Sequence, residues 1–318
     1  MEMSKRRSPD LQLLTVCSMD ARDAETLEDD PEDILSASLQ SLYGFSPITF
    51  STVGSVFTYS IKSGRLPHPN APTQIHVATP DTQPSNWSLH ASSIWVSSLF
   101  IADHIEELHL DPITTRTQAR SIEDDVIHVL ELGAGAGLPS ILLASIYPNV
   151  SVTASDYPDD RLIQTLSDNI RRNAVSKRCR AVPHAWGTDT AALAPARSRR
   201  GDGDAQFDVV FAADTLWNPE LHAPLLDTLC RCLKRSPDAR IHLVAGLHTG
   251  RYTIQSFLNG TQLRGLVLQS ATEREVGGTL SRRWDVSRAE GEDERERRRW
   301  VVWMILKWAD PGGVLKSL

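Results

Sequence analysis

Two spacings of hydrophobic residues alternate along the central part of the chain. Short apolar runs, many of them β-branched, occupy 126–132, 150–156, 179–186, 207–213 and 240–247. Between them, apolar residues recur every three or four positions at 138–147, 160–174, 219–233 and 252–258. The first spacing is typical of buried strands and the second of amphipathic helices. Repeated strand–helix units of this kind predict a parallel sheet with helices on both faces.

The last part of the chain has a different pattern. Residues 266–276 and 300–308 have the composition of strands, and no helix of normal length separates them. Their connector, 285–299, is mostly charged, and we predict a solvated loop there. Two strands joined without a crossover helix pair antiparallel. The predicted fold class is therefore α/β, a Rossmann-like, seven-stranded and mostly parallel sheet that ends in a C-terminal antiparallel hairpin.

The chain ahead of this region divides into further parts. Residues 1–45 are polar and acidic, which predicts a poorly ordered tail, with a docking segment as the alternative. Residues 46–85 contain short alternating stretches that predict a small β-hairpin extension. From about Ser88 an apolar helical face begins, and we predict that 86–310 is the main domain. Residues 188–206 lack periodicity and are predicted to be a surface insertion.

Composition and charge narrow the choice of partners. The formal charge of −7 disfavours nucleic acid, which normally requires a basic face. The four cysteines are not spaced as metal ligands, so we expect reduced thiols and no metal. No apolar run has the form of a secretory signal, and none is long enough to span a membrane. We expect a cytoplasmic monomer without membrane contacts, with the nucleus as the alternative location.

A glycine-rich turn stands where the first predicted strand of the sheet passes into a helix. Gly133, Gly135 and Gly137 leave room for a tight turn and for a ligand at the helix N-terminus. The third glycine comes one residue too early for the dinucleotide pattern G-x-G-x-x-G. Glu131 would repel a phosphate but attract the sulfonium and ammonium groups of S-adenosylmethionine. The turn is therefore predicted to bind this methyl donor, with a turn shaped only by packing as the alternative.

Two further residues at strand ends fit a nucleoside ligand. Asp156 ends the next predicted strand, at the distance past the glycines where an acidic residue holds a ribose diol. The alternative is that it caps the following helix, although Asp159 is better placed for that. Trp186 follows the third strand, and ligands of open α/β sheets bind at the carboxyl ends of strands. We predict that Trp186 packs against adenine, with a buried core tryptophan as the alternative.

The ordered motifs of the chain resemble a known family. They are 94–98 (IWVSS), 130–140 (LELGAGAGLPS), 155–158 (SDYP) and 207–218 (FDVVFAADTLWN). Together they resemble the lysine methyltransferase-like family of seven-β-strand enzymes. Within it, the resemblance is closest to fungal nicotinamide N-methyltransferase-like proteins, whose best understood relatives are elongation factor 1-alpha N-terminal and lysine methyltransferases. The resemblance extends from about Ser88 to Trp308.

The resemblance implies roles for individual residues. The implied cofactor contacts, besides Glu131, are Trp95, Gly133, Ala134, Gly135, Asp156, Trp186 and Ala213. The family's acid-x-x-aromatic motif falls on Asp214 and Trp217, which are the implied catalytic residues. Relatives usually have Tyr or Phe where this chain has Trp217, and the loop 246–251 also differs. Both departures leave the cofactor assignment intact but put the identity of the substrate in doubt.

The chemistry of an amine acceptor fits these two residues. Asp214 could accept a hydrogen bond from the amine, and Trp217 could hold an ammonium by a cation–π contact of about 0.5–2 kcal/mol. His248 is a further candidate contact. We expect an N-methyltransferase for a protein lysine or N-terminal amine, with a translation factor such as elongation factor 1-alpha among the candidate substrates. The alternatives are a methyltransferase for a small molecule, either nicotinamide or a fungal metabolite, and a non-enzymatic interaction module.

Overall fold

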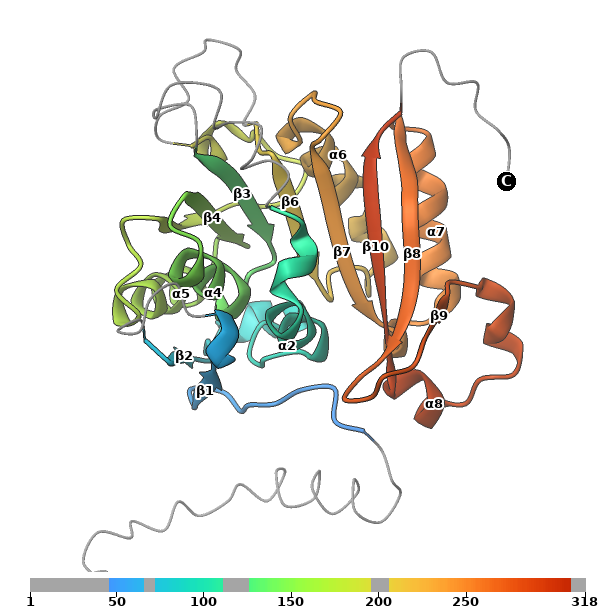
Figure 1. The fold of residues 1–318 in the computed structure, drawn as a ribbon, viewed down its shortest axis with the longest axis horizontal. Coiled ribbons are helices and arrows are strands. Elements are labelled where there is room, and N and C mark those ends of the chain that lie inside the picture. Colours follow the sequence, from blue (N-terminus) through green and yellow to red (C-terminus); the bar gives the residue numbers. More distant parts are fainter. Residues whose placement is uncertain (1–45, 66–71, 111–125, 196–205, 310–318) are drawn as a thin grey trace, which may run out of the picture. The chain divides into compact units, whose positions relative to one another are not determined.

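Five parallel strands form one side of a mixed sheet, and antiparallel strands complete the other side (Figure 1). The computed structural model describes residues 46–65, 72–110, 126–195 and 206–309, all within one unit, Gly44–Leu318. The tail predicted at 1–45 therefore lies outside the described residues. Within these ranges, no cluster of histidine, cysteine or carboxylate side chains is arranged to hold a metal ion. No helix there combines the length and the apolar character needed to cross a membrane.

The strand order of the sheet is β5-β4-β3-β6-β7-β10-β8-β9. Its strands are β3 (Ile127–Leu132), β4 (Val150–Asp156), β5 (Cys179–Pro183), β6 (Val209–Ala213), β7 (Arg240–Gly246), β8 (Leu266–Glu275), β9 (Ser281–Arg283) and β10 (Trp300–Trp308). β3 to β7 run parallel, and Leu130 pairs with Thr153 on one side and Val210 on the other. β10 inserts antiparallel between β7 and β8. The predicted fold class is confirmed, with the short strand β9 added at one edge.

Helices cover both faces of this sheet because its strands alternate their side chains between two apolar cores. On one face lie α2 (Val96–Asp103), α4 (Leu138–Ile146) and α5 (Asp160–Arg172), which pack with Val129 of β3. On the other lie α6 (His222–Cys232) and α7 (Arg251–Gln262), which pack with Leu130. A short helix, α8 (Glu294–Arg298), precedes β10.

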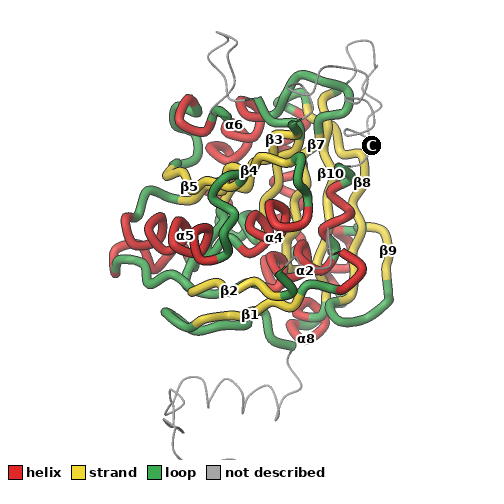
Figure 2. The backbone as a smooth tube through the Cα atoms, turned by 60° about the vertical axis from the view of Figure 1, so that its left-hand side comes forward, coloured by secondary structure: helices red, strands yellow, loops and turns green. Residues whose placement is uncertain are grey.

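A separate two-stranded sheet packs on the α4–α5 side (Figure 2). Its strands, β1 (Val56–Ser60) and β2 (Gln74–Ala78), pair antiparallel. Ile75 and Val77 of β2 are fully buried in the core. The side chain of Asn169 on α5 continues the hydrogen bonding, because it accepts from the Ala78 N–H and donates to the Ala78 carbonyl, both at 2.8 Å. The domain limits at residues 45 and 85 stay a prediction.

The segment ahead of β1 forms a strap over the start of α2. Phe50 donates its N–H to the Ile94 carbonyl at 2.9 Å, and Val96 donates to the Ile48 carbonyl at 2.8 Å. Trp95 between them is extended, with φ −82° and ψ 153°. Helix α2 therefore begins at Val96, later than the predicted start near Ser88, because the backbone at Trp95 is held in the strap. Residues Pro84–Leu89 form a separate 3₁₀ helix.

The connector between β8 and β10 was predicted as a solvated loop; its residues are exposed or partly exposed, but it is more ordered than a loop. It contains the 3₁₀ helix Val286–Glu290 and α8, and the side chain of Glu292 is buried in an ion-pair network. Charged residues are mostly exposed in folded proteins, and the sequence pattern gives no sign of a buried partner. The partner, Arg251, lies on a distant element, and the network is described below.

Candidate functional site

A cavity of about 350 Å³ lies where the carboxyl ends of the parallel strands meet. This volume is in the range of pockets for small molecules. Nine of the ten predicted site residues line it, namely Trp95, Gly133, Ala134, Gly135, Asp156, Trp186, Ala213, Asp214 and Trp217. The structure therefore brings together residues from five separate segments of the chain. Their individual roles stay predictions.

Three left-handed backbone positions shape the glycine turn between β3 and α4. Gly133, Gly135 and Gly137 have φ of 71°, 53° and 82°, which side chains other than glycine adopt rarely. A Cβ at Gly133 would come within 2.8 Å of the Thr215 Cγ2, and one at Gly137 within 2.5 Å of the Leu166 Cδ1. All three positions therefore favour glycine for conformation, and Gly133 and Gly137 also leave little space for a side chain.

Asp156 ends β4 beside this turn with its carboxylate partly satisfied by the backbone. One oxygen accepts from the Gly135 N–H at 2.6 Å, and the other accepts from the Tyr157 N–H at 2.7 Å. Burial outweighs these bonds and raises the pKa of Asp156 to about 6. A carboxylate has about four acceptor positions, so Asp156 can still accept hydrogen bonds from two ligand hydroxyls.

Glu131 does not line the cavity, and its predicted role as a cofactor contact is corrected here. Its side chain turns under the first turn of α4, where one oxygen accepts from the Ser140 N–H at 3.2 Å and from the Ser140 hydroxyl at 2.5 Å. The residue is 1% exposed, and burial raises its pKa to about 8. Glu131 therefore faces α4 and not the cavity, and its burial favours the neutral carboxyl.

The raised pKa of Glu131 gives a testable pH dependence of stability. The unfolded chain releases this proton near pH 4.5, whereas the folded chain keeps it to about pH 8. The contribution of the Glu131 carboxyl to the free energy of unfolding is therefore complete below pH 4.5 and is lost as the pH rises through 8. We expect Glu131→Gln to have a smaller fall in Tm between pH 6 and pH 9 than the parent chain. Glu220→Gln, an exposed control, should keep the parental slope, and equal slopes in all three would disprove the expectation.

Asp214 has a left-handed backbone and links three elements. Its φ is 50°, a conformation that aspartate tolerates better than most residues. One carboxylate oxygen accepts from the Ser97 N–H at 3.2 Å, and the other accepts from the Gly246 N–H at 2.7 Å. The side chain of Trp95 does not cap α2, so Asp214 supplies the acceptor for its first turn. The residue is 9% exposed and lines the cavity.

The two cavity carboxylates stand on either side of the glycine turn. Asp156 ends β4 and Asp214 follows β6, and these strands flank β3 in the sheet. Neighbouring strands are about 4.8 Å apart, so the two residues are roughly 10 Å apart along the sheet edge. Among the described residues, those lining the cavity include no lysine or arginine. The cavity is therefore suited to a ligand with positive charge.

Four rings form a row along the cavity wall, in the order Trp217, His90, Trp95 and His248. The Trp217 and His90 ring centroids are 5.0 Å apart and those of His90 and Trp95 are 6.1 Å apart, both edge to face. Trp95 and His248 stack with their centroids 5.6 Å apart. The Trp95 indole N–H also donates to the His90 carbonyl at 2.7 Å. His90 was not predicted as a site residue, because a lone histidine in a polar stretch has no distinguishing pattern.

Comparison with known proteins agrees with this geometry. A sequence profile described as lysine methyltransferase matches residues 83–260, more than half of the chain. A Neurospora crassa protein named protein N-terminal and lysine N-methyltransferase is 31% identical over 49% of this chain and 53% of its own length. The Schizosaccharomyces pombe protein of the same name is 30% identical over 55% of this chain and 62% of its own length. The chain thus spans little more than half the length of these relatives.

Solved structures give weaker likenesses. A fibrillarin pre-rRNA processing protein of Methanococcus jannaschii has a TM-score of 0.39 and 14% identity, covering 57% of this chain and 66% of that one. A likeness of this size does not bear on function. The extent of the sequence match is decisive for the family. The chain belongs to the lysine methyltransferase family.

Proposed function

We propose that the chain is an S-adenosylmethionine-dependent N-methyltransferase that acts on a protein, at a lysine or an N-terminal amine. The observation that carries this proposal is the cavity with a carboxylate on each side of a glycine turn and no lysine or arginine among the described residues of its wall. Both the proposed donor and the proposed acceptor carry positive charge. The names of the relatives support a protein substrate.

The residues near Asp156 fit the methyl donor. Asp156 would hold the two ribose hydroxyls, and the glycine turn would leave room for the ligand to contact the protein backbone. Trp186 and Ala213 would border the same ligand. When bound, S-adenosylmethionine supplies a methyl group on a sulfonium, which passes to the lone pair of the acceptor nitrogen and leaves S-adenosylhomocysteine.

The residues near Asp214 fit the acceptor. A lysine amine is protonated at pH 7, and releasing that proton to the solvent before methyl transfer costs about 4.6 kcal/mol. Each Asp214 oxygen accepts one backbone hydrogen bond, so both retain acceptor capacity for the amine. Trp217 would stabilise the ammonium by a cation–π contact. The buried position of Asp214 would keep the amine away from water, so that its alignment is preserved.

The acceptor would be a translation factor, as the resemblance of the sequence implies. We further propose that the protein acts as a monomer in the cytoplasm, with the nucleus as the alternative location. None of these proposals affects the assignment of the cavity residues.

The proposal is tested by incubating the protein with a cell extract and S-adenosylmethionine labelled in its methyl group. We expect the label in a discrete protein band and its loss when excess S-adenosylhomocysteine is added. Label confined to the small-molecule fraction would instead indicate a metabolite acceptor. Calorimetry provides the check on the cofactor, because binding of NAD without binding of S-adenosylmethionine or S-adenosylhomocysteine would overturn the proposal.

A further inference from the structure

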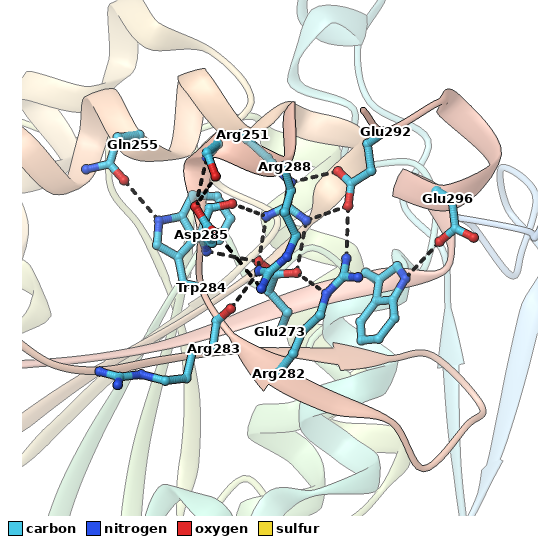
Figure 3. A network of polar contacts seen from close by, with 12 residues as sticks. Arg251, Gln255, Glu273, Arg282, Arg283, Trp284, Asp285, Arg288, Glu292 and Glu296 are labelled. Carbon is cyan, nitrogen blue, oxygen red and sulfur yellow. Dashed lines mark hydrogen bonds and ion pairs between the residues drawn. The ribbon is translucent and has the colours of Figure 1, made fainter. Parts of the chain in front are cut away.

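A buried ion network lies beside the start of α7 (Figure 3). At its centre the Arg251 side chain is fully buried, and all five of its N–H groups find acceptors. Two contacts reach Glu273 at 2.5 and 2.9 Å, two reach Glu292 at 2.7 and 2.5 Å, and one reaches the Asp285 carbonyl at 3.1 Å. The guanidinium is thus saturated from both sides by carboxylates.

Further arginines bind the outer side of the same carboxylates. Arg282 donates to Glu273 at 2.7 Å and to Glu292 at 2.9 Å, and Arg288 donates to Glu273 at 3.0 Å. Glu273 belongs to β8, whereas Arg282, Arg288 and Glu292 belong to the segment between β8 and β10. The network therefore fastens that segment to the first residue of α7.

A short covalent path joins Arg251 to the cavity. Arg251 follows Gly250, whose φ is 94°, and the 3₁₀ helix Leu247–Thr249, against which α8 also packs. His248 of this 3₁₀ helix stacks on Trp95. It also covers Gly246 so closely that a Cβ there would lie 2.2 Å from the His248 Cε1. Gly246 in turn donates its N–H to Asp214, so the path ends at the proposed acceptor contacts.

Stability alone does not account for a network of this kind. Burying several charges carries a desolvation cost, and apolar side chains of similar volume often stabilise a protein as well or better. What a saturated guanidinium provides is a fixed direction, because its donors form a rigid planar fork. A fixed orientation of Arg251 constrains the turn that immediately precedes it.

We propose that Arg251 is a positioning residue for the acceptor end of the cavity. It holds the turn 246–250 so that His248 stacks on Trp95 and Gly246 meets Asp214. The consequence for catalysis rests on the proposed function, whereas the consequence for the Trp95 ring does not. Loosening the network should therefore disturb the acceptor end and leave the Asp156 end unchanged.

The first test follows the Trp95 indole directly. The protein is labelled with ¹⁵N-tryptophan, and its indole N–H signal is assigned by its loss in Trp95→Phe. Arg251→Lys keeps the charge but cannot make five directed bonds, so we expect the Trp95 signal to shift or broaden. Arg264→Lys is the matched control, because Arg264 makes an exposed ion pair with Asp227 just past the other end of α7. If Arg251→Lys does not fold, Arg282→Gln removes only outer contacts and should move the signal in the same direction.

An unmoved Trp95 signal in the folded Arg251 or Arg282 variant would overturn the proposal. So would an equal shift in Arg264→Lys. Because no methyl transfer is involved, this outcome is separate from any failure of the proposed function.

The second test uses the protein substrate labelled in the extract. Arg251→Lys should raise its KM or lower kcat by about 10- to 100-fold, the penalty of a small misplacement. The Kd for S-adenosylhomocysteine should change by less than turnover does, because Trp95 is touched by the turn that Arg251 holds, whereas Asp156 and the glycine turn lie outside this path. Because Arg251 acts through the turn that carries His248, the losses of Arg251→Lys and His248→Ala should be less than additive in the double variant. Additive losses would show that Arg251 does not act through His248.

Discussion

Asp214→Asn is expected to slow methyl transfer by about 100-fold, the penalty for losing the alignment of a reacting group. Asparagine keeps one oxygen for either the Ser97 or the Gly246 N–H, but it loses the negative charge that would orient the amine. The Kd for S-adenosylhomocysteine should remain close to the parental value, because Asp156 and the glycine turn are unchanged. Turnover of the labelled substrate and calorimetry with S-adenosylhomocysteine measure the two effects separately.

Asparagine is preferable to alanine at this position for a structural reason. Alanine would leave two buried N–H groups without an acceptor, at about 1–3 kcal/mol each, and would loosen the start of α2. A matched control is Asp208→Asn at the opposite end of β6, where the carboxylate also accepts a backbone N–H, that of His128 at 3.0 Å. Turnover in Asp214→Asn equal to the parent, or a loss as large in Asp208→Asn, would remove Asp214 from the mechanism.

Asp156→Asn is expected to weaken S-adenosylhomocysteine binding by about 100- to 10,000-fold, since two charge-assisted hydrogen bonds are worth about 1.5–3 kcal/mol each. The parent should also bind less tightly as the pH falls through 6, because protonation removes acceptor capacity from a carboxyl whose pKa is about 6. The variant has no such group and should show a flatter pH profile. Calorimetry at pH 5.5 and pH 8 compares the two proteins.

The neighbouring Asp160→Asn serves as the control for Asp156. Asp160 is exposed at the start of α5 and does not line the cavity. The Asp160→Asn variant should bind S-adenosylhomocysteine as the parent does at both pH values. If Asp156→Asn also bound like the parent, the ribose would have to be held elsewhere in the cavity.

The main sheet and most of the cavity were predictable because both depend on local patterns. Apolar runs locate β3, β4, β6 and β7, and parallel strands bring their carboxyl ends to one edge. Residues that follow those strands, such as Asp156 and Asp214, therefore meet without any knowledge of packing. The family motifs then add Trp95, which lies ahead of the sheet.

Features that depend on side-chain direction or on distant partners were not predictable. Glu131 lies beside the glycine turn in sequence, yet the strand face on which it stands directs it under α4. His248 was a candidate contact from the sequence, but its stacking on Trp95 and the presence of His90 in the same ring row were not, because the two histidines come from distant segments. The charged connector 285–299 looked solvated because its buried partners, Arg251 and Glu273, are recognised only once α7 and β8 are in place.

The position of the strap at Ile48–Phe50 bears on which end of the described chain is better suited to an attached label. It pairs with the backbone on both sides of Trp95, and Ile48 itself lines the cavity. The described chain therefore enters beside the cavity, ahead of the family match that starts at residue 83. It ends after β10, which runs antiparallel to β7, so Ala309 lies at the edge of the sheet away from the cavity. A fluorophore or immobilisation handle attached beyond Ala309 joins the described structure at that edge, whereas one attached ahead of Ile48 joins it beside the cavity.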